Sequence, residues 1–362
     1  MKTLHVLYSG LGGASSVVFS LLKENKKKIL KNNDILFTGN YLFKGYKDKA
    51  KKTNNNYFFI KTRKFFPWLY WFKIFLFLCK KKPDLVFLHN FQFIPVLFYK
   101  LIFWKKIIYI DHQSENFLKL KSTINIIVSL FFFNFIIFVN KKKSLNFKKK
   151  FIFFKRKISH IPNSVDIDFF KNSIKNKDNK QFVIGMAARL DSGKRHELVI
   201  KTLNHPKLKH FNIIFLIVGR GANIDYLKAL TKKEGLLNKV IFNGSLGENK
   251  MKLWYKKLNL YAHATNGEGM SISILEAMSM KIPVIGSNVD GVKNLFNAKK
   301  NIGMLFENSI HDLAKKIEFF YKSSEVTKTL FKEKQRKFIE DNYSSIIMFN
   351  NYKKIILKIL SK

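Results

Sequence analysis

The sequence has almost no cysteine: Cys79 is the only one in 362 residues. No internal disulfide can form, and no group of cysteines and histidines has the spacing of a zinc site. We therefore expect a protein of the reducing cytosol. The start of the chain lacks the pattern of a signal peptide, because the apolar run after Lys2 is short and reaches a glycine at Gly10. We expect no translocation across a membrane.

Acidic residues are scarce as well, with 24 Asp and Glu against 67 Lys and Arg, so the formal net charge is +43. Such a charge fits a nucleic acid, a membrane surface or no specific partner. Lys, Asn, Ile and Phe are abundant and all have A/T-rich codons, so part of the lysine content reflects base composition. No helix-turn-helix, zinc-finger, RRM or KH pattern is present. We therefore do not expect nucleic acid as a partner.

The chain also lacks an uninterrupted run of the ~20 apolar residues that a membrane-spanning helix needs. Residues 122–140, STINIIVSLFFFNFIIFVN, are interrupted by Ser129 and Asn134. We therefore do not expect a single spanning helix; the division that we prefer, a buried helix followed by a strand that ends near Asn140, is implied by the family resemblance described below.

A second apolar segment, 62–82, reads TRKFFPWLYWFKIFLFLCKKK and is interrupted by Pro67 and Lys73. It interleaves cations with large aromatic side chains, which can place rings among lipid headgroups and lysines near anionic lipid. We expect peripheral contact with an anionic membrane surface here. The alternative is a helix that packs its rings into the core, and both can hold on different faces.

Short apolar segments alternate with helical ones along the chain, which is typical of parallel sheets with crossover helices. The predicted strands are LHVLYS, DLVFLH, KIIYID, FIIFVN, FVIGMA, FLIVG, VIFNG and PVIGS. With 47% hydrophobic residues, the chain is long enough for two α/β cores. We expect two domains with a boundary near residue 162.

Two glutamates, Glu268 and Glu276, lie on either side of a loop-to-helix junction in NGEGMSISILEAMSMKIPVIGS. Gly267 and Gly269 let the backbone approach a ligand closely, and a helix is predicted over 271–280. The start of such a helix is an anion site, because its first amides have no intrahelical partner.

We expect unpaired amides at Gly269, Met270 and Ser271, which would suit a phosphate. Glu268 beside them would face hydroxyls, and Glu276 inside the helix would reach a second polyol. The pair therefore suggests a ligand with a central diphosphate and a sugar at each end. The alternative is that Glu268 only complements the helix dipole and Glu276 is solvated.

A third pattern places two cations between a strand and a helix. The segment FVIGMAARLDSGKRHELVIKTL carries Arg189 and Lys194 on one loop. Two such cations are natural partners of a diphosphate, whose charge they would neutralise as a leaving group departs. The alternative is a solvated basic loop in a lysine-rich chain.

Two patterns in the first half of the chain point to ligand binding. The segment TLHVLYSGLGGASSVVFSLLKEN has a strand, a turn with Gly10, Gly12 and Gly13, and a helix, and these glycines would let the backbone meet a phosphate. In IYIDHQSE, a buried strand delivers His112 at its carboxyl end, where open α/β sheets bind ligands. A tight turn and a structural histidine are the alternatives.

Together with HIPNSVDIDFF at 160–170, these segments resemble, in the same order, family 4 of the retaining glycosyltransferases and its E-x7-E signature. The resemblance implies the GT-B fold, an α/β fold of two Rossmann-like domains whose parallel sheets face each other across a central cleft. It places an acceptor-side domain at 1–162 and a nucleotide-sugar-binding domain at 163–342. The helical segment 343–362 would return to complete the first domain.

The resemblance also implies roles for the candidate residues. The donor would be a nucleotide sugar, bound as substrate, and no cofactor or metal would be required. Arg189 and Lys194 would hold its diphosphate, Glu276 its ribose, and Glu268 the transferred sugar. His112 would orient that sugar near the reacting carbon.

The backbone near 242–245 would meet the base of the donor. The chain departs from the family at Met270 and Ser271, where an aromatic residue and a glycine are common. It also reads DGVKN from Asp290, where Gly-Gly-x-x-Glu is frequent. These departures leave the identity of the sugar open.

The predicted activity is transfer of a sugar, expected to be a hexose, to a hydroxyl of a glycan or lipid-linked acceptor with retention of configuration. The departing diphosphate would help to deprotonate the acceptor. The enzyme would act in surface polysaccharide or glycolipid synthesis, in the cytoplasm and peripherally on the inner face of the cell membrane. Two alternatives stay open: a nucleotide-sugar epimerase of the same fold, and a non-catalytic basic protein that binds membrane or nucleic acid.

Overall fold

A computed structural model describes residues 1–10, 13–25, 30–62, 67–89, 92–112, 120–171, 181–300 and 302–361. The chain forms two compact units. The first unit joins Met1–Ser164 to Ser345–Lys362, and the second is Val165–Ser344. The sequence placed the boundaries near residues 162 and 343, and the units divide after residues 164 and 344.

The first unit is built on a seven-stranded sheet with the order β3-β2-β1-β4-β5-β6-β7, in which all neighbours are parallel. Its strands are β1 (Lys2–Tyr8), β2 (Lys31–Gly39), β3 (Asn56–Lys61), β4 (Leu85–Leu88), β5 (Lys106–Asp111), β6 (Phe135–Phe138) and β7 (Ile158–His160). Because side chains alternate along a strand, Leu4 and Val6 enter one core while Leu7 enters another.

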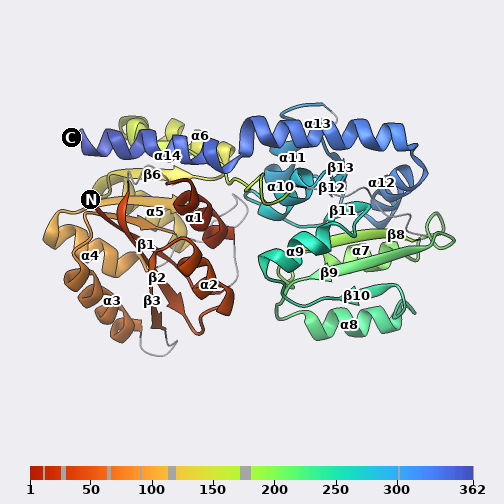
Figure 1. Cartoon of the computed structure of the whole chain (residues 1–362), viewed down its shortest axis with the longest axis horizontal. Helices are drawn as coiled ribbons and strands as arrows, with labels where there is room; N and C mark the ends of the chain where they lie inside the picture. The colour runs from red at the N-terminus through yellow and green to blue at the C-terminus, as the bar shows by residue number, and fades with distance from the viewer. Residues whose placement is uncertain are drawn as a thin grey trace. The chain divides into compact units, whose positions relative to one another are not determined.

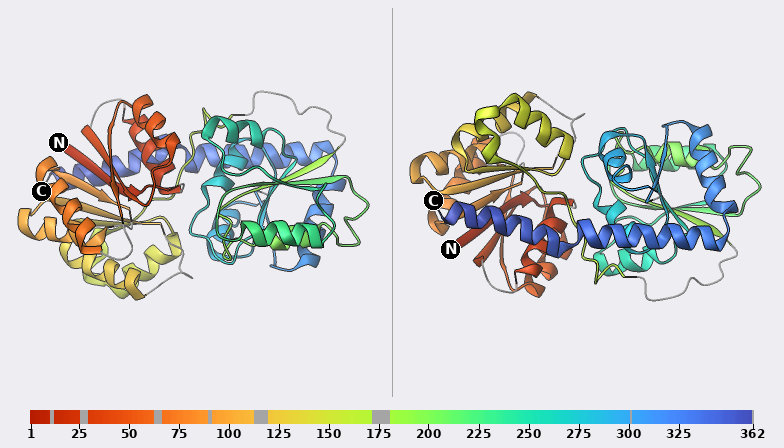
Figure 2. Two further views of the ribbon diagram at one scale, coloured as in Figure 1. Left: turned by 90° about the horizontal axis from the view of Figure 1, so that it is seen from below. Right: turned by 90° about the horizontal axis from the view of Figure 1, so that it is seen from above.

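Helices cover both faces of this sheet (Figure 2). One face carries α3 to α6, and the other carries α1, α2 and α14, with α14 packed beside α1 (Figure 1). The helices are α1 (Gly13–Glu24), α2 (Lys44–Lys52), α3 (Pro67–Lys81), α4 (Phe93–Phe103), α5 (Leu120–Phe132), α6 (Lys141–Lys150), the 3₁₀ helix η2 (Ile152–Lys157) and α14 (Ser345–Leu360).

The second unit has a six-stranded parallel sheet with the order β10-β9-β8-β11-β12-β13. Its strands are β8 (Phe182–Ala187), β9 (Ile213–Val218), β10 (Val240–Phe242), β11 (Leu260–His263), β12 (Val284–Ser287) and β13 (Met304–Phe306).

Helices α7, α8 and α12 pack on one face of the second sheet, and α9, α10, α11 and α13 pack on the other. Their bounds are α7 (His196–Thr202), α8 (Ile224–Lys233), α9 (Glu248–Tyr255), α10 (Ile272–Ser279), α11 (Asp290–Phe296), α12 (Ile310–Lys322) and α13 (Glu325–Tyr343). Of the polar residues of interest, Arg189, Lys194 and Glu268 therefore lie in loops at the edge of the second sheet, and Glu276 lies within α10.

The eight strands predicted from the sequence are confirmed as β1, β4, β5, β6, β8, β9, β10 and β12. The segment 122–140 divides into α5 and β6, as predicted. The sequence reading missed β2, β3, β7, β11 and β13. Three of these have only three or four residues, too few to display a periodic pattern of their own.

Among the described helices, none combines the length and the apolar character required to cross a bilayer. Within the segment 62–82, residues 63–66 lie outside the described residues, and α3 follows them. This helix buries two aliphatic side chains in the first core but exposes Trp68 by 59% and Phe72 by 61%. One face of α3 therefore packs into the fold while the other presents rings to solvent.

Each sheet has one point at which the order of its strands reverses, between β1 and β4 in the first and between β8 and β11 in the second. Open α/β sheets bind ligands beyond the carboxyl ends of their strands at such reversals. The loop after β8 carries Arg189 and Lys194, and the loop after β11 carries Glu268. The fold thus brings these distant parts of the sequence to one place.

Candidate functional site

Two loops meet at the reversal between β8 and β11. The backbone of Gly193 accepts hydrogen bonds from the Asn266 amide at 2.9 Å and from the Thr265 hydroxyl at 3.0 Å. The amide of Arg195 donates to the carbonyl of Ala264 at 3.1 Å. These bonds fix the register of the two loops. Because the two loops are aligned in this way, the side chain of Lys194 lies against the carboxylate of Glu268.

Glu268 is held by three donors. Lys194 Nζ lies 2.6 Å from Glu268 Oε2, and His263 Nε2 lies 2.8 Å from the same oxygen. The backbone amide of Gly269 donates to Glu268 Oε1 at 3.1 Å. Burial would raise the pKa of Glu268, but Lys194 and the hydrogen bond from His263 outweigh it and hold the pKa well below its usual range. The carboxylate is therefore ionised and fixed in position.

The bond from Gly269 corrects one sequence expectation. We expected the amides at the start of α10 to be unpaired, and the amide of Gly269 is instead bonded to the neighbouring carboxylate. The physical reason is that the two residues are adjacent in the sequence. The side chain of Glu268 folds back and accepts a hydrogen bond from the amide of the next residue. Met270 is half-buried at this turn, and Ser271 is buried.

His263 is a site residue that the sequence reading missed. It ends β11, is 1% exposed at its side chain, and donates through Nε2 to Glu268. Burial lowers the pKa of His263 in spite of the nearby carboxylate, so the ring is neutral at pH 7 and carries its proton on Nε2. The available signal was a histidine at the end of a short apolar run, five residues before Glu268.

The start of α10 is fixed by hydroxyl groups. Ser271 is the N-cap, and its Oγ accepts from the amide of Ile274 at 3.4 Å. The Oγ atoms of Ser271 and Ser273 are 2.9 Å apart, and the hydroxyl of Tyr261 donates to Ser273 Oγ at 2.7 Å. The serine in place of the family's common glycine thus serves as a helix cap.

Glu276 lies within α10, inside the predicted helix. The hydroxyl of Tyr255, a fully buried residue at the end of α9, donates to Glu276 Oε2 at 2.9 Å. It also reaches the carbonyl of Ser273 at 3.1 Å. Tyr255 therefore orients the second glutamate, a contact that we did not predict from the sequence.

Arg189 and Lys194 share a loop but have different surroundings. The side chain of Lys194 is 14% exposed, whereas that of Arg189 is 73% exposed and pairs with Asp191 at 3.3 Å. Within the described part of the chain, the structure brings Lys194 to Glu268 but does not bring Arg189 to either glutamate. Arg189 is therefore an exposed cation, and among the described residues its one ion pair is with Asp191.

Three glycines allow close backbone approaches around these loops. A Cβ at Gly219 would lie 1.9 Å from the carbonyl oxygen of Ala188, and one at Gly221 would lie 2.1 Å from that of Leu190. A Cβ at Gly291 would lie 2.2 Å from the carbonyl oxygen of Glu268. The backbone of the turn after β9 is thus in close contact with the loop that carries Arg189. The backbone at the start of α11 is in close contact with the loop that carries Glu268. Larger side chains would push both loops away.

In the first unit, His112 is the end of a chain of three histidines. His5 Nδ1 is 3.3 Å from His89 Nε2, and His89 Nδ1 is 3.0 Å from His112 Nε2. Burial lowers the pKa of His5 to about 3 and that of His112 to about 4, and the pKa of His89 lies well below its ordinary value for the same reason. All three rings are therefore neutral at pH 7.

Neutral imidazoles have one donor and one acceptor, so the tautomer of each ring in this chain determines the next. His5 Nε2 is buried and has no hydrogen-bond partner among the described residues. A buried N–H without a partner is rarer than an acceptor without one, which favours the proton of His5 on Nδ1. His89 then donates to His112 Nε2. The sequence predicted His112 but not the two histidines that set its tautomer.

Three further expectations concern phosphate, base and metal. Gly12 lies outside the described residues, and Gly13 begins α1. The turn 242–245 follows β10 at the carboxyl edge of the second sheet, and its Asn243 accepts from Trp254 Nε1 at 3.2 Å. Among the described residues, no three His, Cys, Asp or Glu side chains are placed so that they could hold a metal ion together.

Comparison with known proteins gives the following matches. Residues 168–344 match the model of the family glycosyl transferases group 1. An uncharacterized glycosyltransferase of Methanocaldococcus jannaschii is 30% identical over 133 residues, which are 36% of this chain and 33% of that protein. The O-antigen biosynthesis glycosyltransferase WbnH of Escherichia coli is 28% identical over 182 residues, or 50% of this chain and 48% of that protein. The matches thus span between a third and a half of these curated relatives.

Among solved structures, Anabaena Alr3699/HepE in complex with UDP and glucose is 17% identical. The match has a TM-score of 0.83 and covers 99% of this chain and 100% of that chain. At this identity the likeness shows the fold, and it confirms the GT-B fold expected from the sequence. Residues 168–344 thus match the family glycosyl transferases group 1, and the chain that carries them has the GT-B fold.

Proposed function

We propose that this protein is a retaining glycosyltransferase of family 4, which moves a hexose from a nucleotide diphosphate to a hydroxyl of a glycan or lipid-linked acceptor. The observation that carries the proposal is the ionised Glu268, held by Lys194 and His263 beside the start of α10, with Glu276 on that helix. The similarity to an O-antigen glycosyltransferase supports a role in surface polysaccharide or glycolipid synthesis.

In the proposed complex, different protein groups would bind the ribose, the diphosphate and the sugar of the donor. Glu276, oriented by Tyr255, would accept hydrogen bonds from the ribose hydroxyls. Lys194, Arg189 and the amides of Met270 and Ser271 would face the diphosphate, and cations aimed at a leaving group stabilise its developing charge. Glu268 would accept from hydroxyls of the transferred sugar, because an ionised carboxylate is an acceptor only.

Acceptor activation would not require a protein nucleophile. Retaining glycosidases use two carboxylates about 5 Å apart, one of them a nucleophile, whereas here the two glutamates are engaged separately by Lys194 and by Tyr255. In the proposed reaction the departing diphosphate takes the proton of the acceptor hydroxyl on the same face of the sugar. His112 in the first unit would hydrogen-bond the sugar, and its tautomer is fixed through His89.

The experiment that tests this proposal is product analysis by mass spectrometry, with a panel of nucleotide hexoses and a mixture of lipid-linked acceptors. Transfer to an acceptor supports the glycosyltransferase. Conversion of the nucleotide sugar without an acceptor would instead assign an epimerase. Inversion of the anomeric centre, read by NMR, would contradict the retaining mechanism.

Arg189→Ala is expected to lower turnover about ten- to a hundredfold, because a charged hydrogen bond is worth roughly 1.5–3 kcal/mol. The melting temperature should stay unchanged, since the guanidinium is exposed and pairs only with Asp191 among the described residues. Steady-state kinetics with and without Mg²⁺ measure the effect, and Lys228→Ala on the exposed face of α8 is the matched control. Restoration by Mg²⁺, or loss of wild-type activity in EDTA, would contradict metal-independent catalysis.

We also propose that the protein acts in the cytoplasm, peripherally on the inner face of the cell membrane. The exposed rings of α3 support this proposal, together with the net charge of +43. Cosedimentation with anionic vesicles is expected at low salt and should be reversed by high salt, because the Debye length falls from about 10 Å at 0.1 M to about 3 Å at 1 M. Protein released only by detergent would show a different mode of attachment.

A further inference from the structure

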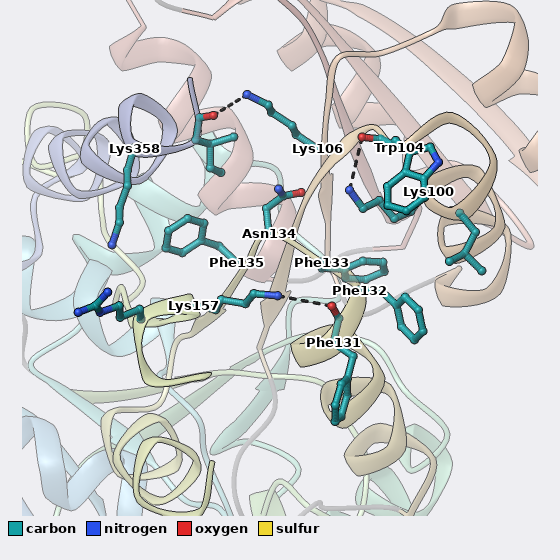
Figure 3. A pocket seen from close by; sticks show the side chains of 13 residues that line it. Lys100, Trp104, Lys106, Phe131, Phe132, Phe133, Asn134, Phe135, Lys157 and Lys358 are labelled. Atoms are coloured by element: carbon teal, nitrogen blue, oxygen red, sulfur yellow. Dashed lines mark hydrogen bonds between the residues drawn. The ribbon is translucent and has the colours of Figure 1, made fainter. Parts of the chain in front are cut away.

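Figure 3 shows a cavity of about 700 Å³ in the first unit, at the amino ends of β5 and β6. Its wall also includes side chains from α4, α5, η2 and α14. None of the lining residues belongs to the candidate site, and the cavity lies at the opposite edge of the sheet from His112, which follows the carboxyl end of β5. In the second unit, by contrast, a buried histidine that the sequence reading did not single out, His196, adjoins the candidate site directly.

His196 is the first residue of α7, and its side chain is completely buried. Its ring atom Nδ1 lies 3.0 Å from the carbonyl oxygen of Lys194, and its backbone amide donates to the same oxygen at 2.8 Å. Because a carbonyl oxygen only accepts, Nδ1 carries the proton of the ring. Burial lowers the pKa of His196 to about 4, so the ring is neutral at pH 7. It therefore holds Lys194 without placing a second positive charge beside the ammonium group.

The two hydrogen bonds from His196 close a tight turn after Lys194. Arg195, at the centre of this turn, has φ of −73° and ψ of 52°, close to the values of an inverse γ-turn. The amide of Arg195 donates to the carbonyl of Ala264, which directly follows β11. The peptide group between Lys194 and Arg195 is thus held at both ends. This peptide group sets the direction from which the side chain of Lys194 reaches Glu268.

The second ring nitrogen of His196 shows that packing alone does not explain a histidine here. Nε2 is buried and has no hydrogen-bond partner among the described residues. A buried polar atom without a partner is unfavourable, and an apolar side chain of similar size would avoid it. What an apolar side chain cannot supply is the N–H of Nδ1 that donates to Lys194.

We infer that His196 is a positioning residue for Lys194: through Nδ1 it fixes the turn that aims the ammonium group at the diphosphate of the donor. The inference rests on the proposed function, in which Lys194 stabilises the leaving diphosphate. His196 holds the backbone of Lys194, and Glu268 holds the ammonium group at the other end of the side chain. Lys194 is therefore fixed before the reaction begins, which is the preorganisation that a cation at a transition state requires.

Two substitutions of His196 separate positioning from packing. Leucine fills a similar volume but has no donor, whereas asparagine is smaller and places an amide N–H where Nδ1 lies. His196→Leu should be at least as stable to heat as His196→Asn, yet its turnover should fall about ten- to a hundredfold, because a small misplacement of a catalytic group costs this much. His196→Asn should retain most of the turnover. If turnover instead follows the melting temperature, with the asparagine variant the slower one, His196 serves packing only and the inference is overturned.

The matched control is Thr202→Val at the other end of α7. Thr202 is buried as well, and its hydroxyl donates to the carbonyl of Leu198 at 2.7 Å. This variant loses a buried hydrogen bond of the same helix without touching Lys194, so its turnover should equal that of the wild type. A loss as large as that of His196→Leu would mean that any damage to α7 slows the enzyme, and would overturn the inference.

A double variant shows whether His196 acts through Lys194. His196→Leu should cause no further loss of turnover when Lys194 is already replaced by alanine, because effects that pass through one group do not add. An additional tenfold loss in the double variant would show that His196 acts on a different group, which is contrary to the inference.

Acetylation of Lys194 tests the positioning without any sugar transfer. The side chain of Lys194 is 14% exposed and paired with Glu268, so a pulse of acetic anhydride should modify it slowly. Peptide mass spectrometry gives its rate relative to Lys228, which is exposed on α8. The relative rate should rise several-fold in His196→Leu and stay at the wild-type level in His196→Asn.

The acetylation rates also tell failure of this inference from failure of the proposed function. Equal relative rates in the wild type and both variants would overturn the positioning role, whatever the activity of the protein. If the rates differ as expected but no nucleotide sugar is turned over, the transferase proposal fails while the hold of His196 on Lys194 is supported.

Discussion

Lys194→Ala should lower turnover about a hundred- to a thousandfold, the range found for removal of one preorganised donor from a transition-state site. It should also reduce the free energy of unfolding of the second unit by about 3 kcal/mol, because removal of one partner strands a buried charge. Lys194 Nζ is 2.6 Å from Glu268 Oε2, and both side chains are about 15% exposed. Steady-state kinetics and chemical denaturation measure the two effects.

A double variant tests whether the stability lost in Lys194→Ala comes from the uncompensated charge of Glu268. Glu268→Gln removes the charge that Lys194→Ala leaves uncompensated, and the amide oxygen can still accept from His263 Nε2. The double variant should therefore recover most of the lost stability while its turnover stays low. Recovery of turnover together with stability would show that Lys194 serves only to hold the fold.

Acidification should unfold the first unit well before its carboxylates are all protonated. The pKa of His5 is lowered to about 3 and that of His112 to about 4, against an ordinary value of 6.5, because both rings are buried. Above pH 6.5 these rings are neutral in both the folded and the unfolded chain. Between pH 6.5 and about 4, the rings of the unfolded chain take up protons and those of the folded chain do not. Stability is therefore complete above pH 6.5 and is lost as the pH falls toward 4, by roughly 1.4 kcal/mol per histidine and pH unit.

Thermal unfolding followed between pH 8 and pH 4 checks this dependence. His5→Phe supplies the control, because a phenyl ring can keep the stacking on Phe87, in which the ring centroids are 4.4 Å apart. On unfolding, this variant should take up one proton fewer per chain than the wild type. Its stability should therefore fall less steeply as the pH is lowered over the same range. A melting temperature that stays constant from pH 7 to pH 5 would mean that the histidines are solvated and protonated in the native state.

Much of the second unit could be predicted from the sequence, because its signals are local. The apolar strands are bounded by glycines or polar residues, and the helix after Glu268 begins at a serine cap and ends at the predicted place. Lys194 and Glu268 were predicted as ligands of one donor from a motif. Their direct contact could not be predicted, since it depends on two loops 74 residues apart that are bonded through Gly193.

The residues that support the two glutamates and the first turn of α10 could not be predicted from the sequence for a related reason. His263, Tyr255 and Tyr261 lie in a short strand and at a helix end, where single polar groups in apolar surroundings are usually structural. Their importance follows from the hydroxyl and imidazole contacts to Glu268, Glu276 and the first turn of α10, which only the folded chain displays. Burial then keeps His263 neutral by lowering its pKa, and the sequence alone does not show how deeply a given side chain is buried.

The most direct test of the donor site is calorimetric titration of uridine, guanosine, adenosine and thymidine diphosphate hexoses into the wild type and Glu276→Gln. At least one donor should bind the wild type, and its affinity for Glu276→Gln should be about ten- to a hundredfold lower, because a charged acceptor for the ribose is lost. The variant should remain folded, since its amide oxygen still accepts from Tyr255. Equal affinity of the two proteins for the donor, or binding of no nucleotide sugar by the wild type, would contradict the site proposed here.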